Sequence, residues 1–205
     1  MPIRAMADRL TFLPHPKMGP LKGDLENRLK SMAQMISSEN YAFFQDKLME
    51  LVLREGFARA NAAEGTVWLL DQNRENLVPV FNTGPKAQEF VGKHRQPLKA
   101  GIISMVAISE QSFCENHVWE NAAQDKTLDE KLNIRTYAMA VVPLYYGTDL
   151  RGVVSCVQLF AEGESKPGGF TPDSLQQLEL TAAVLSKLID YQLLSAAIGL
   201  ETDRP

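Results

Sequence analysis

The chain has 205 residues, of which 45% are hydrophobic and 22% charged, a balance typical of a globular protein with a buried core. Its formal net charge of -4 argues against sequence-independent nucleic-acid binding, which requires clustered lysine and arginine. No apolar run of about 18 residues and no secretion signal is found, so neither a membrane span nor export is expected. The two cysteines, Cys114 and Cys156, form no disulfide framework, which fits a reducing compartment and predicts a cytoplasmic protein.

The N-terminal part of the chain predicts an irregular arm followed by helix. Residues 1–23 are rich in proline and glycine, which predicts a flexible arm. From Asp24, a plausible N-cap, apolar residues recur at helical spacing to about residue 60, with a polar interruption at 37–40. We expect one long helix or two stacked helices there. The first apolar stripe is narrow and flanked by charge, which favours pairing with another helix; packing within a monomer core is the alternative.

Two β-rich segments follow the helical region and predict the first hairpin. Residues 65–71 read GTVWLLD and residues 77–82 read LVPVFN, with polar turn residues between them. Pro79 has no backbone N–H to donate, which indicates an edge position or an irregularity in the second strand.

The sequence of the middle of the chain predicts short helices and one short strand. Residues 85–92 predict a short helix, and residues 102–110 predict an amphipathic helix that opens at a glycine. Residues 113–117 predict a short strand. The charged residues 120–135 predict a surface loop or one more short helix.

The most informative stretch runs from Tyr137 to Phe160 and predicts two strands joined by a tight turn at 147–149. A loop then leads to a helix that Thr171 caps and that Pro172 begins. That helix carries two apolar stripes, one of Leu175, Leu178, Ala182, Leu185, Ile189 and Leu193, the other of Leu180, Val184, Leu188 and Tyr191. Because a helix on a sheet buries one face, the second stripe predicts a further helical partner, from this chain or a second copy.

The predicted order is helix, hairpin, short helices, short strand, hairpin and helix, which indicates an α+β fold with a mostly antiparallel sheet. In that order and at that spacing, six short motifs are similar to the pattern of the GAF domain family. They are GTVWLLD from Gly65, GIISMVA from Gly101, FCEN from Phe113, AVVPLYYG from Ala140, LRGVV from Leu150 and GFTPDSL from Gly169. The resemblance covers roughly residues 40–195.

The resemblance implies a GAF-like fold, with a central antiparallel sheet, N- and C-terminal helices packed on one face and a ligand pocket on the other. It implies a regulatory role, dimerisation through the first and last helices, and an output protein as a possible partner. The chain then divides into a flexible arm (1–23), an N-terminal dimer or signalling helix (24–42), a GAF-like domain (43–196) and a C-terminal tail (197–205).

The ligand signatures of known family members are incomplete in this chain. The loop that matches the cyclic-nucleotide signature offers Asn121, Lys126, Leu128, Asp129 and Glu130. It lacks the adjacent Asn-Lys pair and the phenylalanine, so its plainer interpretation is a charged surface lid. Cys114 lacks the histidine neighbour of bilin-binding members, and His94, flanked by two basic residues, is expected to face solvent. We therefore assign no metal site, and the cofactor stays unknown.

Free methionine sulfoxide reductases share the fold that the resemblance implies, and they use several closely placed cysteines. Cys114 is alone in the pocket region and cannot form their resolving disulfide within the chain. Glycine-rich phosphate loops, G-x-S-x-G and H-E-x-x-H are also missing from the sequence. We expect no enzymatic activity and no catalytic residues, with a methionine-sulfoxide-type reductase as the weaker alternative.

A mostly apolar pocket with a few polar groups is the remaining expectation. Its candidate lining is Phe81, Ile103, Phe113, Glu115, Trp119, Tyr137, Met139 and Gln158. Glu115 and Gln158 would orient an unidentified small molecule, and the aromatic side chains would enclose it. The sequence predicts a homodimeric sensor in which ligand burial under a lid at about 115–135 shifts the packing of the terminal helices. The alternative is a ligand-free dimeric scaffold that binds a partner protein, and neither hypothesis involves nucleic acid or membrane.

Overall fold

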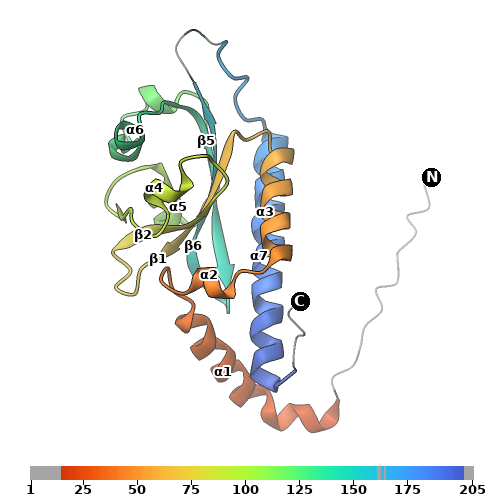
Figure 1. The fold of residues 1–205 in the computed structure, drawn as a ribbon. Helices are drawn as coiled ribbons and strands as arrows, with labels where there is room; N and C mark the ends of the chain where they lie inside the picture. The colour runs from red at the N-terminus through yellow and green to blue at the C-terminus, as the bar shows by residue number, and fades with distance from the viewer. Residues whose placement is uncertain (1–14, 161–162, 164, 201–205) are drawn as a thin grey trace, which may run out of the picture.

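The computed structural model describes residues 15–160, 163 and 165–200. It contains a six-stranded sheet in the order β3-β2-β1-β6-β5-β4, in which every neighbouring pair is antiparallel (Figure 1). The strands are β1 (Glu64–Leu70), β2 (Asn76–Asn82), β3 (Gln96–Pro97), β4 (Phe113–Glu115), β5 (Thr136–Tyr146) and β6 (Asp149–Leu159). The expected α+β class and antiparallel sheet are confirmed.

Helices cover both faces of this sheet (Figure 1). One side, the long-helix face, carries α1 (Lys22–Met35), α2 (Tyr41–Phe44), α3 (Lys47–Arg59) and α7 (Pro172–Ile198), with the 3-10 turn η1 (Pro16–Leu21) before α1. The other side, the short-helix face, carries α4 (Ala87–Phe90), α5 (Ile102–Ser109), η2 (Val118–Glu120) and α6 (Thr127–Leu132). Both terminal helices therefore lie on one side of the sheet, as expected.

The predicted helical region at 24–60 divides into three helices because local hydrogen bonds interrupt it. The Asn40 side chain accepts a hydrogen bond from Ser37 N and donates one to Met35 O, which ends α1 and turns the chain into α2. Asp46 then caps α3 by accepting a hydrogen bond from Met49 N at 2.8 Å. The polar stretch at 37–40 is the break that the sequence predicts.

The β5–β6 hairpin closes through a two-residue turn at Gly147 and Thr148, whose φ angles are 59° and 76°. Positive φ at both positions is the geometry that matches the twist of a tight hairpin. The backbone N–H of Gly147 also donates to Asp190 Oδ1 of α7 at 2.8 Å. The tip of the hairpin is thereby fastened to the C-terminal helix.

Three register shifts interrupt the sheet, one of them between Leu144 and Tyr145, and the other two change which candidate pocket residues face which side. In the β1–β2 pair, Val67 lies opposite Phe81 and Trp68 opposite Pro79, so one residue of β2 bulges between them. This confirms the irregularity that Pro79 indicates. In the β5–β6 pair, the register shifts between Thr136 and Ala138. A bulge re-aims the side chains beside it, so simple alternation fails at both places.

The α7 helix begins as predicted, with the Thr171 side chain accepting a hydrogen bond from Ser174 N at 3.2 Å. Its first stripe enters the core of the long-helix face, where Leu178, Ala182, Leu185, Ile189 and Leu193 are buried. Leu188 of the second stripe packs against the same core, whereas Leu180 is 56% and Tyr191 61% exposed. An apolar strip of α7 is thus exposed on the long-helix side.

The chain ends fall partly outside the described residues. Of the predicted arm at 1–23, residues 1–14 lie outside them, and the remainder forms η1 and the start of α1. Of the predicted tail at 197–205, residues 201–205 lie outside them. Within the described part of the chain, no helix has the length and apolarity needed to cross a membrane.

Candidate functional site

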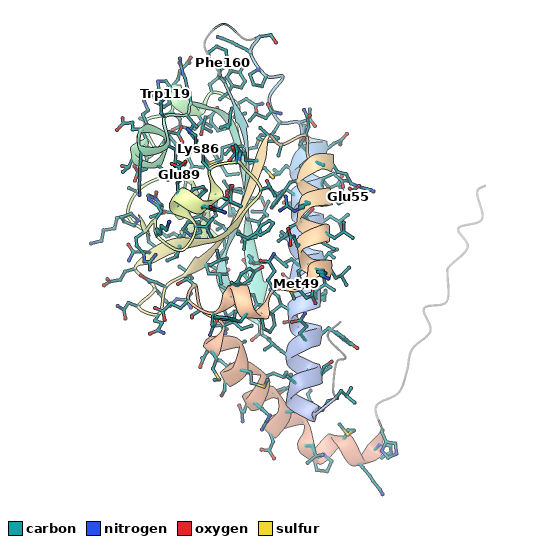
Figure 2. The ribbon with its side chains drawn as sticks, viewed as in Figure 1. Met49, Glu55, Lys86, Glu89, Trp119 and Phe160 are labelled. Carbon is teal, nitrogen blue, oxygen red and sulfur yellow. The ribbon has the colours of Figure 1, made fainter. Side chains whose placement is uncertain are left out.

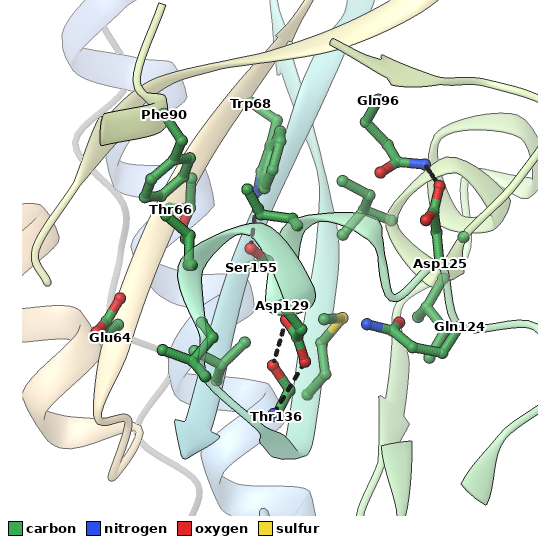
Figure 3. Close-up of a pocket in the computed structure, with 18 of the residues that line it drawn as sticks. Glu64, Thr66, Trp68, Phe90, Gln96, Gln124, Asp125, Asp129, Thr136 and Ser155 are labelled. Carbon is green, nitrogen blue, oxygen red and sulfur yellow. Dashed lines mark hydrogen bonds between the residues drawn. The ribbon is translucent and has the colours of Figure 1, made fainter. Parts of the chain in front are cut away.

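A cavity of about 70 Å³ lies on the short-helix face, between the sheet and the segments that cover it (Figure 3). Strands β1, β5 and β6 supply its floor, and α5, α6 and the turn before α6 supply its roof. Its apolar lining includes Phe90, Ile102, Ile103, Leu128, Leu132, Ile134, Met139 and Val157. At roughly 10–15 Å³ for each water, this space holds on the order of five water molecules or a compact organic molecule.

The cavity floor is polar where β1 and β6 meet. Thr66 lies opposite Ser155 in the β1–β6 pair, and both side chains line the cavity although both residues are buried. Trp68 Nε1 donates to Ser155 Oγ at 2.9 Å, and Asn82 Nδ2 donates to Thr66 Oγ1 at 2.9 Å. Each hydroxyl oxygen accepts from a neighbour, so its own proton is the group available for a further acceptor.

The roof is joined to the floor by Asp129 of α6 and Thr136 of β5. Asp129 Oδ2 accepts from the backbone N–H of Thr136 and Oδ1 from its hydroxyl, both at 3.0 Å (Figure 3). The α6 helix ends at Leu132, and its capping residue Asn133 has φ 48°, which reverses the chain and brings Thr136 back beneath Asp129. Burial raises the pKa of Asp129, while the hydrogen bonds from Thr136 oppose that rise.

Two further carboxylates line the cavity. Glu64 is half-buried at the start of β1, and burial raises its pKa although Asn82 and Lys86 act in the opposite direction. Asp125 accepts a hydrogen bond from Gln96 Nε2 at 3.0 Å, and its pKa is lowered, chiefly by hydrogen bonding to Thr127. Three carboxylates therefore face this space, and its described lining includes no lysine, arginine or histidine.

Because β4 ends at Glu115, the lid predicted at about 115–135 corresponds to residues 116–135, which contain η2 and α6. We call this segment the lid, and cations hold it in place. Trp119 lies in the lid, with Lys126 Nζ 4.5 Å and the Arg135 guanidinium 5.3 Å from its ring centroid. From outside the lid, Lys86 donates a hydrogen bond from its ammonium to the Leu132 carbonyl. Figure 2 places Trp119 near the end of the molecule that also holds Phe160, on which Arg135 stacks.

The structure brings only part of the predicted pocket together. Ile103 and Met139 line the cavity, but the other six candidates do not. Phe113 packs in the apolar cluster of the short-helix face without lining the cavity, and Trp119 belongs to the lid. Glu115 accepts hydrogen bonds from His117 N at 2.9 Å and Asn121 Nδ2 at 3.0 Å, and the first of these is the main cause of its lowered pKa.

Three predicted residues lie on the long-helix face, behind the sheet as seen from the cavity. Phe81 and Tyr137 pack with the core of that face, each beside a bulge. Gln158 is buried there, with Nε2 donating to Asn61 O at 2.9 Å and Oε1 accepting from Gly169 N at 3.0 Å. Its amide fastens the loop before α7 to the sheet, a structural role that satisfies a buried polar group.

Other chemistry-bearing residues lie away from the cavity. Burial raises the pKa of both thiols, Cys114 on β4 and Cys156 in the long-helix core, and neither lines the cavity. His94, expected to face solvent, is instead half-buried, with its ring 6.1 Å from Trp68 in an edge-on contact. Among the described residues, no group of three or more histidines, cysteines or carboxylates could hold a metal ion.

Sequence reasoning missed the polar residues that shape the cavity, chiefly Asp129, Thr136 and Ser155. Ser155 carried a usable signal, because it interrupts an apolar strand and alternates in phase with Val157. Asp129 belongs to the incomplete cyclic-nucleotide signature, but it stands in a charged segment that we interpreted as a surface lid, whereas the structure leaves it only 5% exposed.

Comparison with known proteins identifies a protein family whose model matches this chain. The GAF domain family model matches residues 45–190, and no curated protein matches the sequence. A similar solved structure is the GAF domain of a phosphoenolpyruvate-protein phosphotransferase from Coxiella burnetii, with a TM-score of 0.58 and 15% identity. The alignment covers 91% of this chain and 100% of that one.

Two further structures are similar at the level of the fold. The second GAF domain of DevS from Mycobacterium smegmatis has a TM-score of 0.50 and 20% identity, over 74% of this chain and 95% of that one. Free methionine-R-sulfoxide reductase from Neisseria meningitidis, in complex with its substrate, has a TM-score of 0.51 and 16% identity. The alignment covers 89% of this chain and 97% of that one. The family model spans most of the chain and the sheet has the same fold, so this protein belongs to the GAF domain family.

Proposed function

We propose that this chain is a non-catalytic sensor that binds a small molecule in the cavity and signals through its terminal helices as a homodimer. The observation that carries the proposal is the separation of the two faces. A small cavity with polar groups lies on one face of the sheet, and both terminal helices lie on the other. The free cysteines fit a cytoplasmic location, which is part of the proposal.

Strand β5 offers a physical connection between the two faces. At its beginning, Thr136 donates two hydrogen bonds to Asp129 of the lid. At its end, the turn residue Gly147 donates to Asp190 of α7. A ligand that changes the position of α6 would pull on the first contact, and the strand would transmit the change to the second. Such a ligand shifts the helix packing only if it binds one arrangement more tightly than the other.

The exposed apolar strip on the long-helix side supports dimerisation. Leu180, Val184 and Tyr191 of α7 are exposed, as are Leu48 and Leu51 of α3. The two helices run antiparallel, because Asp46 contacts Gln192 at one end while Gly56 lies against Thr181 at the other. The strip thus extends over two neighbouring helices, and a two-fold axis would bring two copies together as a four-helix layer.

Native mass spectrometry of the full chain tests ligand binding and dimerisation together. We expect a dimer that retains a small molecule in the wild type and loses it in Val157→Phe, which fills the cavity. Val157→Thr keeps the volume of the side chain and is the matched control. A wild-type dimer with no ligand would contradict sensing and favour the scaffold alternative, in which the helices bind a partner protein.

Light scattering of surface variants tests the dimer surface separately. Leu180→Glu combined with Tyr191→Glu places charge on the exposed strip, which should halve the measured mass. Glu179→Gln on the exposed side of the same helix is the control and should leave the mass unchanged. A wild-type monomer, or a double variant that stays dimeric, would contradict dimerisation through α7.

The weaker alternative, a methionine-sulfoxide-type reductase, has little chemical support. A reactive thiol needs a lowered pKa and access, but burial and neighbouring Glu115 raise the pKa of Cys114. Turnover of free methionine sulfoxide by the purified chain, abolished in Cys114→Ser, would establish the reductase and contradict the non-catalytic proposal.

A further inference from the structure

The charge of the cavity lining restricts what the cavity can bind. Glu64 comes from β1, Asp125 from the turn before α6 and Asp129 from α6 itself, so the carboxylates reach the space from separate segments. In Figure 3, Glu64 and Asp125 lie on opposite sides of the cavity and Asp129 lies between them. The described lining offers no basic side chain to oppose them. An anionic ligand would therefore enter beside like charge with no cation among the described lining residues to compensate it, which is costly at a desolvated site.

Asp129 keeps acceptor capacity toward the cavity. One of its oxygens accepts a hydrogen bond from the backbone N–H of Thr136 and the other accepts from the Thr136 hydroxyl. A carboxylate has about four lone-pair positions, and two are used here, so acceptor capacity remains for a ligand. Lys86 is a nearby cation outside the described lining, and its ammonium donates a hydrogen bond to the carbonyl of Leu132, a lining residue.

The volume of the cavity and its uncharged lining residues further restrict the class of ligand. Because the described histidines, cysteines and carboxylates form no metal-binding cluster, a bare metal ion is a poor occupant. The volume of about 70 Å³ accepts a compact molecule, and Trp68, Phe90 and several aliphatic side chains supply surface for a short apolar part. Aromatic faces also attract cations at short range.

Resting on the proposed function, we infer that the cavity takes a small organic cation, an amine or guanidinium compound with a short apolar group, and rejects anions of the same size. The cationic end would donate hydrogen bonds to Asp129 and Glu64, while the apolar end would contact Ile103 and Met139. The site is defined by the cavity, and its carboxylates decide the class of ligand.

A methyl NMR titration of the full chain with three probes of matched size tests this inference. The probes are methylguanidinium, its neutral isostere N-methylurea, and propionate. The Met139 methyl lines the cavity and reports binding, whereas the Met49 methyl lies on α3 in the core of the other face and is the internal control (Figure 2). We expect methylguanidinium to shift Met139 and not Met49, and the other two probes to shift neither at the same concentration.

Carboxylate variants identify the groups that select the cation. Glu64→Gln and Asp129→Asn should each weaken methylguanidinium binding by about tenfold, the usual scale for one charge-assisted hydrogen bond. Glu55→Gln on the exposed side of α3 should leave it unchanged. Glu64 is only half-buried, so its variant stays informative even where Asp129→Asn fails to fold.

The outcomes separate this inference from the function on which it rests. If N-methylurea or propionate shifts Met139 as strongly as methylguanidinium does, the cavity binds ligands but does not select cations, and the inference alone is overturned. If no probe shifts Met139, the inference is overturned as well, and the sensor proposal is decided independently by the ligand retained in native mass spectrometry.

Discussion

The two faces of the sheet differ in what fills them. On the long-helix face, residues such as Leu178, Leu185 and Ile189 are fully buried against β5 and β6. On the short-helix face, the same strands present Thr136 and Ser155 to a cavity beneath a lid. Close packing stabilises the first face, and the second has polar groups and space for a ligand. A sheet whose side chains alternate can thus divide stability and binding between its two sides.

The largest expected effect comes from matched leucine deletions on the two faces. Leu185→Ala should cost about 4 kcal/mol in the free energy of unfolding, because it leaves a void in a closely packed core. Leu132→Ala in the lid should cost about 2 kcal/mol, since Leu132 already borders an open space that the lid can close. Urea denaturation measures both, and equal costs would contradict the difference between the faces.

The contact between Asp129 and Thr136 should control the lid. Thr136→Val removes the hydroxyl donor and leaves a buried carboxylate with one fewer hydrogen bond, at a cost of about 1–2 kcal/mol. Hydrogen exchange in α6 should accelerate, while exchange in the buried part of α7 should not. Thr136→Ser keeps the hydroxyl and is the control. Unchanged α6 exchange in Thr136→Val would show that this contact does not hold the lid.

A smaller effect is expected from the aromatic contact in the lid. Trp119→Ala removes the ring on which Lys126 and Arg135 stack, at a cost of about 1 kcal/mol. Trp119→Phe keeps an aromatic face and should lose less. Limited proteolysis between η2 and α6 should be faster in the alanine variant. Equal cleavage rates in all three proteins would contradict a role for these cations in closing the lid.

The smallest effect is a pH dependence at Asp129. Burial raises its pKa in the folded state above the ordinary value of 3.8, against the hydrogen bonds from Thr136 and together with the charge of Glu130. The folded state therefore binds the carboxyl proton of Asp129 more tightly than the unfolded state does. The contribution of Asp129 to the free energy of unfolding therefore falls as the pH rises from the unfolded-state pKa through the folded-state pKa. Relative to Asp129→Asn, the wild type should lose stability in urea denaturation as the pH rises above the ordinary pKa of 3.8. A slope of opposite sign would mean that the hydrogen bonds outweigh burial.

Local sequence signals predicted the fold because they act over a few residues. Thr171 caps α7, Gly147 and Thr148 close the β5–β6 hairpin, and Asn40 ends the first helix, each through neighbours in the chain. The candidate lining was harder to predict. Phe81 and Tyr137 lie at bulges, where one extra residue reverses the direction in which a side chain points. No local sequence pattern predicts the bulge in β5.

The cavity also depends on contacts between distant segments. Gln158 interrupts an apolar strand and so attracts attention, but its partners are Asn61 and Gly169 on the long-helix side. Ser155 interrupts the same strand on the opposite face, opposite Thr66 of β1. Which interruption faces the cavity depends on how helices cover the sheet, and that arrangement is not encoded in either residue's neighbours.

Hydrogen exchange of the full chain, with and without methylguanidinium, tests most directly the claim that the cavity face binds and the long-helix face responds. The account predicts that the probe slows exchange in α6 and at Thr136 and changes it at Gly147, whose N–H donates to Asp190 of α7. Exchange around Leu185 should stay the same. A probe that alters only α3 and α7, or that leaves α6 and Gly147 unaffected, would contradict the account.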